Sequence, residues 1–66
     1  MTLLVNGKPM AAADGTTVAG LLAALSMGEK KVAVEVNREL VIRKDWAAHI
    51  LNDGDRVEVV TFVGGG

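Results

Sequence analysis

The residues best suited to chemistry are the last five, Phe62-Val63-Gly64-Gly65-Gly66. Glycine has no Cβ, so three in a row give a slim, flexible segment that leaves a terminal carboxylate unobstructed. One interpretation is a frayed end, because the last residues of most domains are poorly ordered. The other is that the carboxylate of Gly66 is the reactive group of the protein. The rest of the sequence, which precedes this segment, provides the evidence for choosing between these two interpretations.

Composition excludes several classes of protein. The chain has 66 residues, enough for one small domain. It has no cysteine, which rules out disulfides and thiolate metal sites. The single histidine, His49, has no cluster of carboxylates around it in the sequence, so we expect no metal site and no catalytic role for it. We also expect no enzyme activity, since one small domain leaves little room for a catalytic cleft.

The charge pattern argues against nucleic acid and membrane partners. Seven basic and eight acidic residues are well mixed, and the formal net charge is −1. Only Trp46 and Phe62 are aromatic, too few for a platform that stacks bases. No apolar run approaches the roughly 20 residues of a membrane span, and the N-terminal residues do not resemble a signal peptide. We therefore expect a cytoplasmic protein.

The first elements are predicted by a turn signal and a helical repeat. Residues 2–5 are β-prone and lead into Asn6-Gly7, the strongest short-range hairpin signal, so residues 8–12 form the return strand. Pro9 cannot donate a ladder hydrogen bond, which favours an edge position for that strand. Thr16 or Thr17 then caps a helix that runs to about residue 25. Its apolar residues recur at helical spacing: Val18, Leu21, Leu22 and Leu25.

Two glycines bear on that helix. Gly20 lies inside it and costs about 1 kcal/mol relative to alanine. Either the site tolerates the glycine or the helix approaches the sheet closely there. Gly28 follows the periodic residues and is interpreted as the signal that ends the helix.

The second half of the chain reads as a hairpin, an irregular connection and a last strand. Alternation predicts a strand over 32–36, a turn at residues 37–38 and a return strand over 39–42. In the connection that follows, over 43–50, Trp46 is expected to anchor the core with its indole N–H bonded to a partner. Residues 52–55, Asn-Asp-Gly-Asp, predict a turn before the last strand, 56–63.

The last strand has two different faces. One face of this strand begins with charged residues and ends with the apolar residues Val60 and Phe62. These two residues either form an exposed contact site for a partner or are covered by a loop.

The order of elements predicts an α+β fold, the ubiquitin-like β-grasp. It is a mixed sheet with one main helix packed on one face. The first and last strands run parallel in this arrangement, and the C-terminus projects from a central strand. We expect residues 1–61 to form the domain and residues 62–66 to form a flexible glycine-rich tail.

Several motifs along the chain occur together in a characteristic order. They are the Asn6-Gly7 hairpin, the capped helix with Leu21-Leu22, the segment 32–41 with its turn at Asn37, Arg43 with Trp46, Asp53-Gly54-Asp55, and Gly65-Gly66. This set resembles the ThiS family, the small ubiquitin-like sulfur carriers of thiamine biosynthesis. The resemblance covers the whole chain, and the segment around Arg43 and Trp46 favours ThiS over related carriers.

The resemblance implies a defined chemistry. The Gly66 carboxylate would be adenylated with ATP by an E1-like activating enzyme of the ThiF type. It would then take sulfur from a persulfide, supplied through a cysteine desulfurase, and become a thiocarboxylate. A thiazole synthase of the ThiG type would use that sulfur. Gly64 and Gly65 would thread the tail into both enzymes, while Val60 and Phe62 would contact the partners.

The residues agree with that chemistry. No glycine-rich loop with Lys and Ser/Thr is present to cradle phosphates, so ATP must be bound and consumed by the partner, and we expect no bound cofactor. Without cysteine, sulfur can be held only on the acyl group of the C-terminus. Other interpretations remain. The chain could serve molybdopterin synthesis or tRNA thiolation, or it could be a non-reactive β-grasp binding module.

Overall fold

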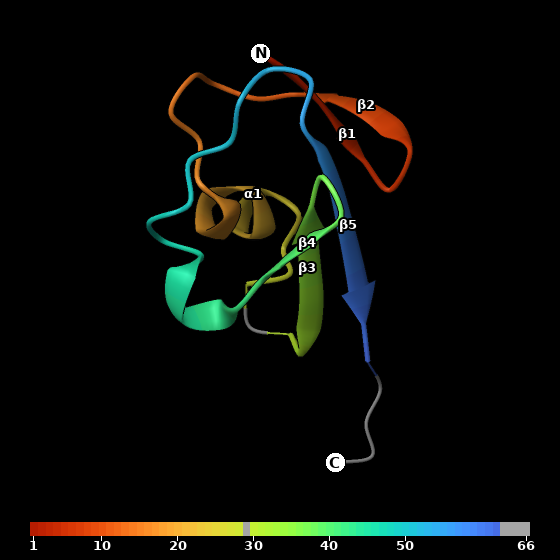
Figure 1. Ribbon diagram of the computed structural model, residues 1–66, viewed down its shortest axis with the longest axis vertical. Helices are drawn as coiled ribbons and strands as arrows, with labels where there is room; N and C mark the ends of the chain where they lie inside the picture. Colours follow the sequence, from red (N-terminus) through yellow and green to blue (C-terminus); the bar gives the residue numbers. More distant parts are fainter. Residues whose placement is uncertain (29, 63–66) are drawn as a thin grey trace.

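The computed structural model describes residues 1–28 and 30–62, so Gly64, Gly65 and Gly66 lie outside the described residues. Within these described residues, five strands form one mixed sheet in the order β2-β1-β5-β3-β4, with a single α-helix beside it (Figure 1). The elements in chain order are β1 (Thr2–Val5), β2 (Lys8–Ala11), α1 (Val18–Ala24), β3 (Val32–Val36), β4 (Glu39–Val41), the 3₁₀ turn η1 (Arg43–Asp45) and β5 (Arg56–Thr61).

The predicted hairpins are confirmed. β1 pairs antiparallel with β2, and β3 pairs antiparallel with β4. The first turn has positive φ at Asn6 (50°) and Gly7 (82°), and the second at Asn37 (51°) and Arg38 (72°). Two consecutive left-handed residues match the right-handed twist of the strands that they connect. β2 is an edge strand, as Pro9 requires.

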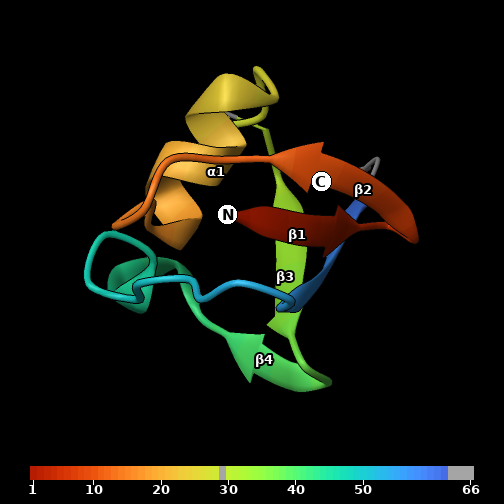
Figure 2. The same cartoon turned by 90° about the horizontal axis from the view of Figure 1, so that it is seen from above.

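β5 lies at the centre of the sheet. It pairs parallel with β1 on one side and antiparallel with β3 on the other. Looking along the molecule from above, the helix lies on one side of the sheet only (Figure 2). These pairings confirm the ubiquitin-like β-grasp, in which the last strand is central.

The helix begins and ends close to the predicted positions, but the residue that ends it is not the predicted one. The Thr17 hydroxyl accepts a hydrogen bond from the Gly20 N–H at 3.1 Å and caps the N-terminus. At the other end, Ser26 takes φ 59°, and its N–H bonds to the Ala23 carbonyl. The Met27 N–H bonds to the Leu22 carbonyl at 2.8 Å, which completes a Schellman motif.

The prediction that Gly28 ends the helix was therefore wrong. The left-handed residue is Ser26, two positions earlier, and nothing in its residue type announced that conformation. For Gly20, a built Cβ would meet only Thr17 Oγ1 at 3.5 Å and Thr16 Cγ2 at 3.7 Å. Both are ordinary contacts within the helix entry. The site thus tolerates the glycine, and no close approach to the sheet requires it.

One apolar core fills the space between the helix and the inner face of the sheet. Trp46 is 6% exposed, and its indole N–H donates to the Val41 carbonyl at 2.9 Å, as predicted. The Arg43 guanidinium lies 4.6 Å from the centre of the indole ring and covers its outer side. The remaining buried residues are Leu3, Val5, Val18, Leu21, Leu22, Val32, Val34, Val36, Val41, Leu51, Val57 and Val59.

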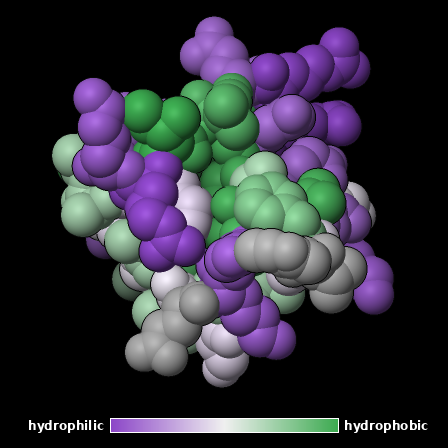
Figure 3. Space-filling view, turned by 90° about the horizontal axis from the view of Figure 1, so that it is seen from below, coloured by the Kyte–Doolittle hydropathy of each residue, from purple (hydrophilic) through white to green (hydrophobic). Residues whose placement is uncertain are grey.

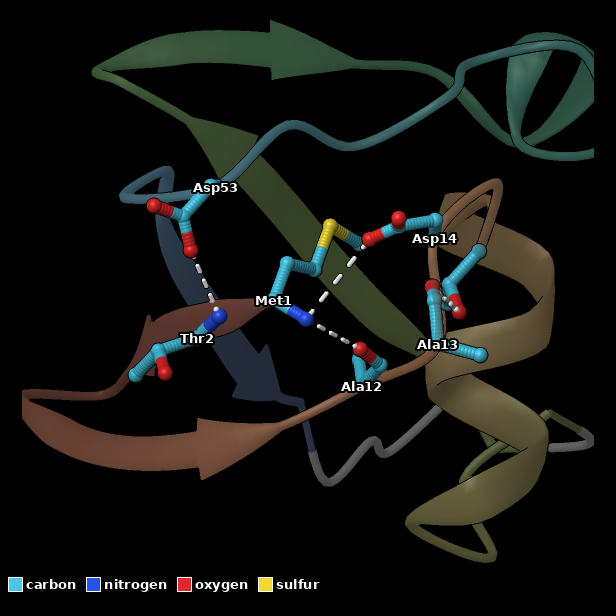
Figure 4. Close-up of polar contacts among 7 residues, drawn as sticks. Met1, Thr2, Ala12, Ala13, Asp14 and Asp53 are labelled. Atoms are coloured by element: carbon cyan, nitrogen blue, oxygen red, sulfur yellow. Dashed lines mark hydrogen bonds and ion pairs between the residues drawn. The ribbon is translucent and has the colours of Figure 1, made fainter.

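The turn before β5 is hydrogen-bonded to the start of β1, the strand that pairs parallel with β5. Asp53 accepts a hydrogen bond from the Thr2 N–H at 2.7 Å, and Gly54 has φ 85° (Figure 4). In the same region the Met1 nitrogen donates to the Ala12 carbonyl at 2.8 Å and lies 3.7 Å from the Asp14 carboxylate. The start of β1 is thus fixed against both the turn and the strand beside it.

Candidate functional site

The candidate site is the end of β5, where the chain leads into the glycine sequence. Val57 and Val59 of this strand face the core at 0% and 6% exposure. Beyond Thr61, the Phe62 N–H still donates to the Lys31 carbonyl at 3.0 Å. Hydrogen bonds on the β3 side therefore hold the backbone up to residue 62, whereas β1 pairs with β5 only at its start, at Arg56 and Val57.

Val60 and Phe62 project from the opposite, outer face of the sheet. They are 58% and 53% exposed, and the sequence had left open whether a loop covers them. Among the residues that the structure describes, no loop does so. That they bind a partner stays a prediction.

Two further apolar residues lie on this outer face, and sequence reasoning missed them. Leu40 is 64% exposed and Ile42 is 46% exposed. Val41 between them points into the core, so Leu40 points outward, and the extended backbone of Ile42 continues the alternation. Leu40 is in register with Glu35, which β3 presents on the same face as Ala33, the partner of Val60.

We call Leu40, Ile42, Val60 and Phe62 the outer-face patch. Viewed from the end of the molecule where β5 finishes, apolar surface gathers among hydrophilic groups (Figure 3). The sequence contained a signal for Leu40 and Ile42, because both flank Val41, whose side chain points inward. That signal could predict membership of the patch only after the strand order had placed β4 in the same sheet as β5.

Basic side chains gather at the same end of the sheet. The Arg43 guanidinium donates to the Lys30 carbonyl at 3.2 Å, so η1 is tied to the segment that leads into β3. Lys30, Lys31, Arg43 and Lys44 are all exposed. The Lys31 carbonyl is the group that accepts from Phe62, so this positive charge lies close to where the described part of β5 ends.

The described residues offer little else for chemistry. Within 1–28 and 30–62 no group of His, Asp or Glu side chains could hold a metal ion. Over the same residues, no helix has the length and apolar character needed to cross a membrane. A groove of about 400 Å³ lies between β2 and α1, and its lining residues carry no titratable side chain. His49 is half-buried, and its carbonyl accepts from the Val18 N–H.

Comparison with known proteins settles the family. A profile described as the ThiS family matches residues 3–66. The chain belongs to the ThiS family. The sulfur carrier protein ThiS of Escherichia coli is 36% identical over 66 residues, and the match covers the whole of both chains.

The fold agrees with a solved ThiS structure. The crystal structure of the thiamine biosynthesis protein ThiS from Geobacter metallireducens matches with a TM-score of 0.85 and 42% identity. Each chain is covered over its full length. A second kind of relative is longer. The thiazole synthase of Magnetococcus marinus is 46% identical over the 66 residues, and the present chain spans about a fifth (20%) of its length.

Proposed function

We propose that this member of the ThiS family is a sulfur carrier for thiazole formation in thiamine biosynthesis, with the Gly66 carboxylate as its reactive group. The observation that carries the proposal is the match to the family over residues 3–66, which includes the terminal glycines. The position of β5 supports it, because a central strand whose pairing on the β3 side continues to its end gives partners a rigid base next to the sequence that follows.

Activation comes first. A carboxylate is an anion at neutral pH and repels a sulfur nucleophile. Transfer of AMP from ATP to the Gly66 carboxylate, with release of pyrophosphate, removes that charge and provides a leaving group. An E1-like enzyme of the ThiF type binds ATP and performs this step, so the carrier itself holds no cofactor. We also propose that the protein acts in the cytoplasm.

Sulfur transfer follows. The terminal sulfur of a persulfide, supplied through a cysteine desulfurase, attacks the acyl carbon, and AMP leaves. A thiol then takes the inner sulfur as a disulfide and releases the Gly66 thiocarboxylate. A thiazole synthase of the ThiG type receives this sulfur. Relatives named thiazole synthase, one of them from Magnetococcus marinus, support that partner.

In this scheme the chain is a protein co-substrate, and other proteins supply the catalysis. Val60 and Phe62 contact the partners, and Gly64 and Gly65 thread through their active-site channels. The direct test is the intact mass of the full chain after incubation with the activating enzyme, ATP and a persulfide donor. We expect one oxygen of Gly66 to be replaced by sulfur. An unchanged mass with an activating enzyme that is competent on another ThiS would overturn the proposal.

Substitution at the reactive residue sharpens the test. We expect Gly66→Ala to keep the fold and to lose most of the sulfur transfer, about 100-fold or more, because a methyl group misplaces the acyl carbon in a narrow channel. Thermal unfolding of the variant checks the fold, and the rate of thiocarboxylate formation checks the chemistry. Wild-type rates for the alanine variant would refute the threading role.

A further inference from the structure

The outer face of the sheet places two like charges directly opposite each other. Glu35 of β3 and Glu58 of β5 are register partners. The Asn37 N–H donates to the Arg56 carbonyl at 2.8 Å, which makes that pair a hydrogen-bonded one. Such pairs recur at every second residue of an antiparallel ladder, so Glu35 and Glu58 form the next one, with Cα atoms about 5.5 Å apart.

Neither carboxylate forms an ion pair within the part of the chain that the structure describes. No basic side chain there forms a salt bridge with Glu35 or with Glu58. Arg56 shares the outer face but is not paired with Glu58. Like charges directly opposite on neighbouring strands destabilise a sheet. A cationic group from outside the domain would therefore be favoured over this pair.

The acidic pair borders the outer-face patch. Leu40 is the register partner of Glu35 on its other side, and Val60 lies two residues beyond Glu58 on the same face. Exposed apolar side chains next to two carboxylates without an ion pair define what a binding partner should present. The partner should have an apolar hollow that receives the patch and an arginine or a lysine that lies over the carboxylate pair. A partner that meets both requirements gains orientation from the charges as well as area from the patch.

We propose that the outer-face patch with Glu35 and Glu58 is the docking surface for the thiazole synthase partner, which presents an arginine or a lysine to the two carboxylates. This inference rests on the proposed function. The synthase is the chosen occupant because two relatives named thiazole synthase include a segment like this chain, so the two surfaces coexist in one polypeptide there. Such a linkage raises the effective concentration of the two surfaces.

The test removes the two charges and keeps the shape of the side chains. The full chain with Glu35→Gln and Glu58→Gln is titrated against purified thiazole synthase by calorimetry at low and high salt. We expect the double variant to bind about tenfold more weakly or worse, with a flatter dependence of Kd on salt. We also expect its Tm to rise by about 2–5 °C, because the repulsion in the free domain is gone. A structural role for the pair would not combine higher stability with weaker binding.

Glu39→Gln is the matched control. Glu39 is exposed on β4, but its register partner Val36 faces the core, so this carboxylate lies off the outer face. Its loss should leave Kd for the synthase unchanged. Equal weakening by the control would mean that only net charge matters, and wild-type affinity of the double variant would mean that the pair is not at the interface. Either result overturns the proposal.

Two further measurements separate this inference from the proposed function. If wild-type protein acquires sulfur at Gly66 but the double variant binds the synthase normally, only the docking surface is wrong. If wild-type protein never acquires sulfur, the carrier function fails whatever the affinities are. If the double variant loses affinity for the activating enzyme alone, the surface belongs to that enzyme, and the assignment to the synthase is overturned.

Discussion

The two faces of the sheet are built from the same strands and differ in what covers them. On the inner face Leu3, Val34 and Val57 are 0% exposed beneath α1 and the connection around Trp46. On the outer face Leu40 and Val60 are more than half exposed, at 64% and 58%. Alternate residues of one strand thus serve different purposes. The inner ones supply the burial that stabilises a small domain, and the outer ones remain available for partners.

The largest effect that this comparison predicts is on stability. Leu22→Ala removes a fully buried side chain of α1 and leaves a cavity, so we expect a loss of about 2–5 kcal/mol in the free energy of unfolding. A domain of this size has little stability to spare, so much of the variant should be unfolded. Urea denaturation followed by Trp46 fluorescence measures the loss.

Leu40→Ala is the matched change on the outer face. It should cost less than about 0.5 kcal/mol, because the side chain is mostly in solvent already. Comparable losses for the two alanine variants would contradict the division between the faces.

Substitutions on the outer face should weaken partner binding while leaving stability nearly unchanged. We expect Val60→Ala combined with Phe62→Ala to weaken affinity for the activating enzyme and for thiazole synthase by about tenfold or more. The free energy of unfolding should change by less than about 1 kcal/mol, since both side chains are over half exposed. Calorimetric titration beside urea denaturation gives both quantities. Wild-type affinity for both enzymes would remove the patch from the interface.

The smallest predicted effect concerns the helix that covers the inner face. Ser26 holds a left-handed conformation that disfavours any side chain, so Ser26→Gly should stabilise the fold by about 0.5–1 kcal/mol. Gly28→Ala is the control, because a Cβ there meets nothing within 4 Å and the backbone is not left-handed. Thermal unfolding should show a higher Tm for the first variant and no loss for the second. The reverse order would mean that Gly28 is the true end of the helix.

Much of the fold followed from local rules. Asn6-Gly7 was predictable because only a few residue types tolerate consecutive positive φ angles, and the second turn was predictable from Asn37, although Arg38 beside it also has positive φ. Thr17 was predictable as a cap because its hydroxyl satisfies a free N–H of the first turn. The position of the helix end followed from the apolar repeat, but the left-handed residue that ends it was not predictable in this way. Ser26 adopts its conformation because the Schellman hydrogen bonds compensate for it, and that balance depends on the whole turn.

In the candidate site, too, some features were predictable from the sequence and others were not. The sequence by itself determined the alternation that turns Val60 and Phe62 away from Val59 and the family to which the motifs point, and it predicts the reactive end. Tertiary structure alone decided which residues join them. Glu35 lies beside Glu58 of β5, which is distant in the chain, and Leu40 joins the same face on the other side of β3. Local preferences shape a strand, but the register between distant strands is set by packing of the shared core, and only that register assembles the outer face.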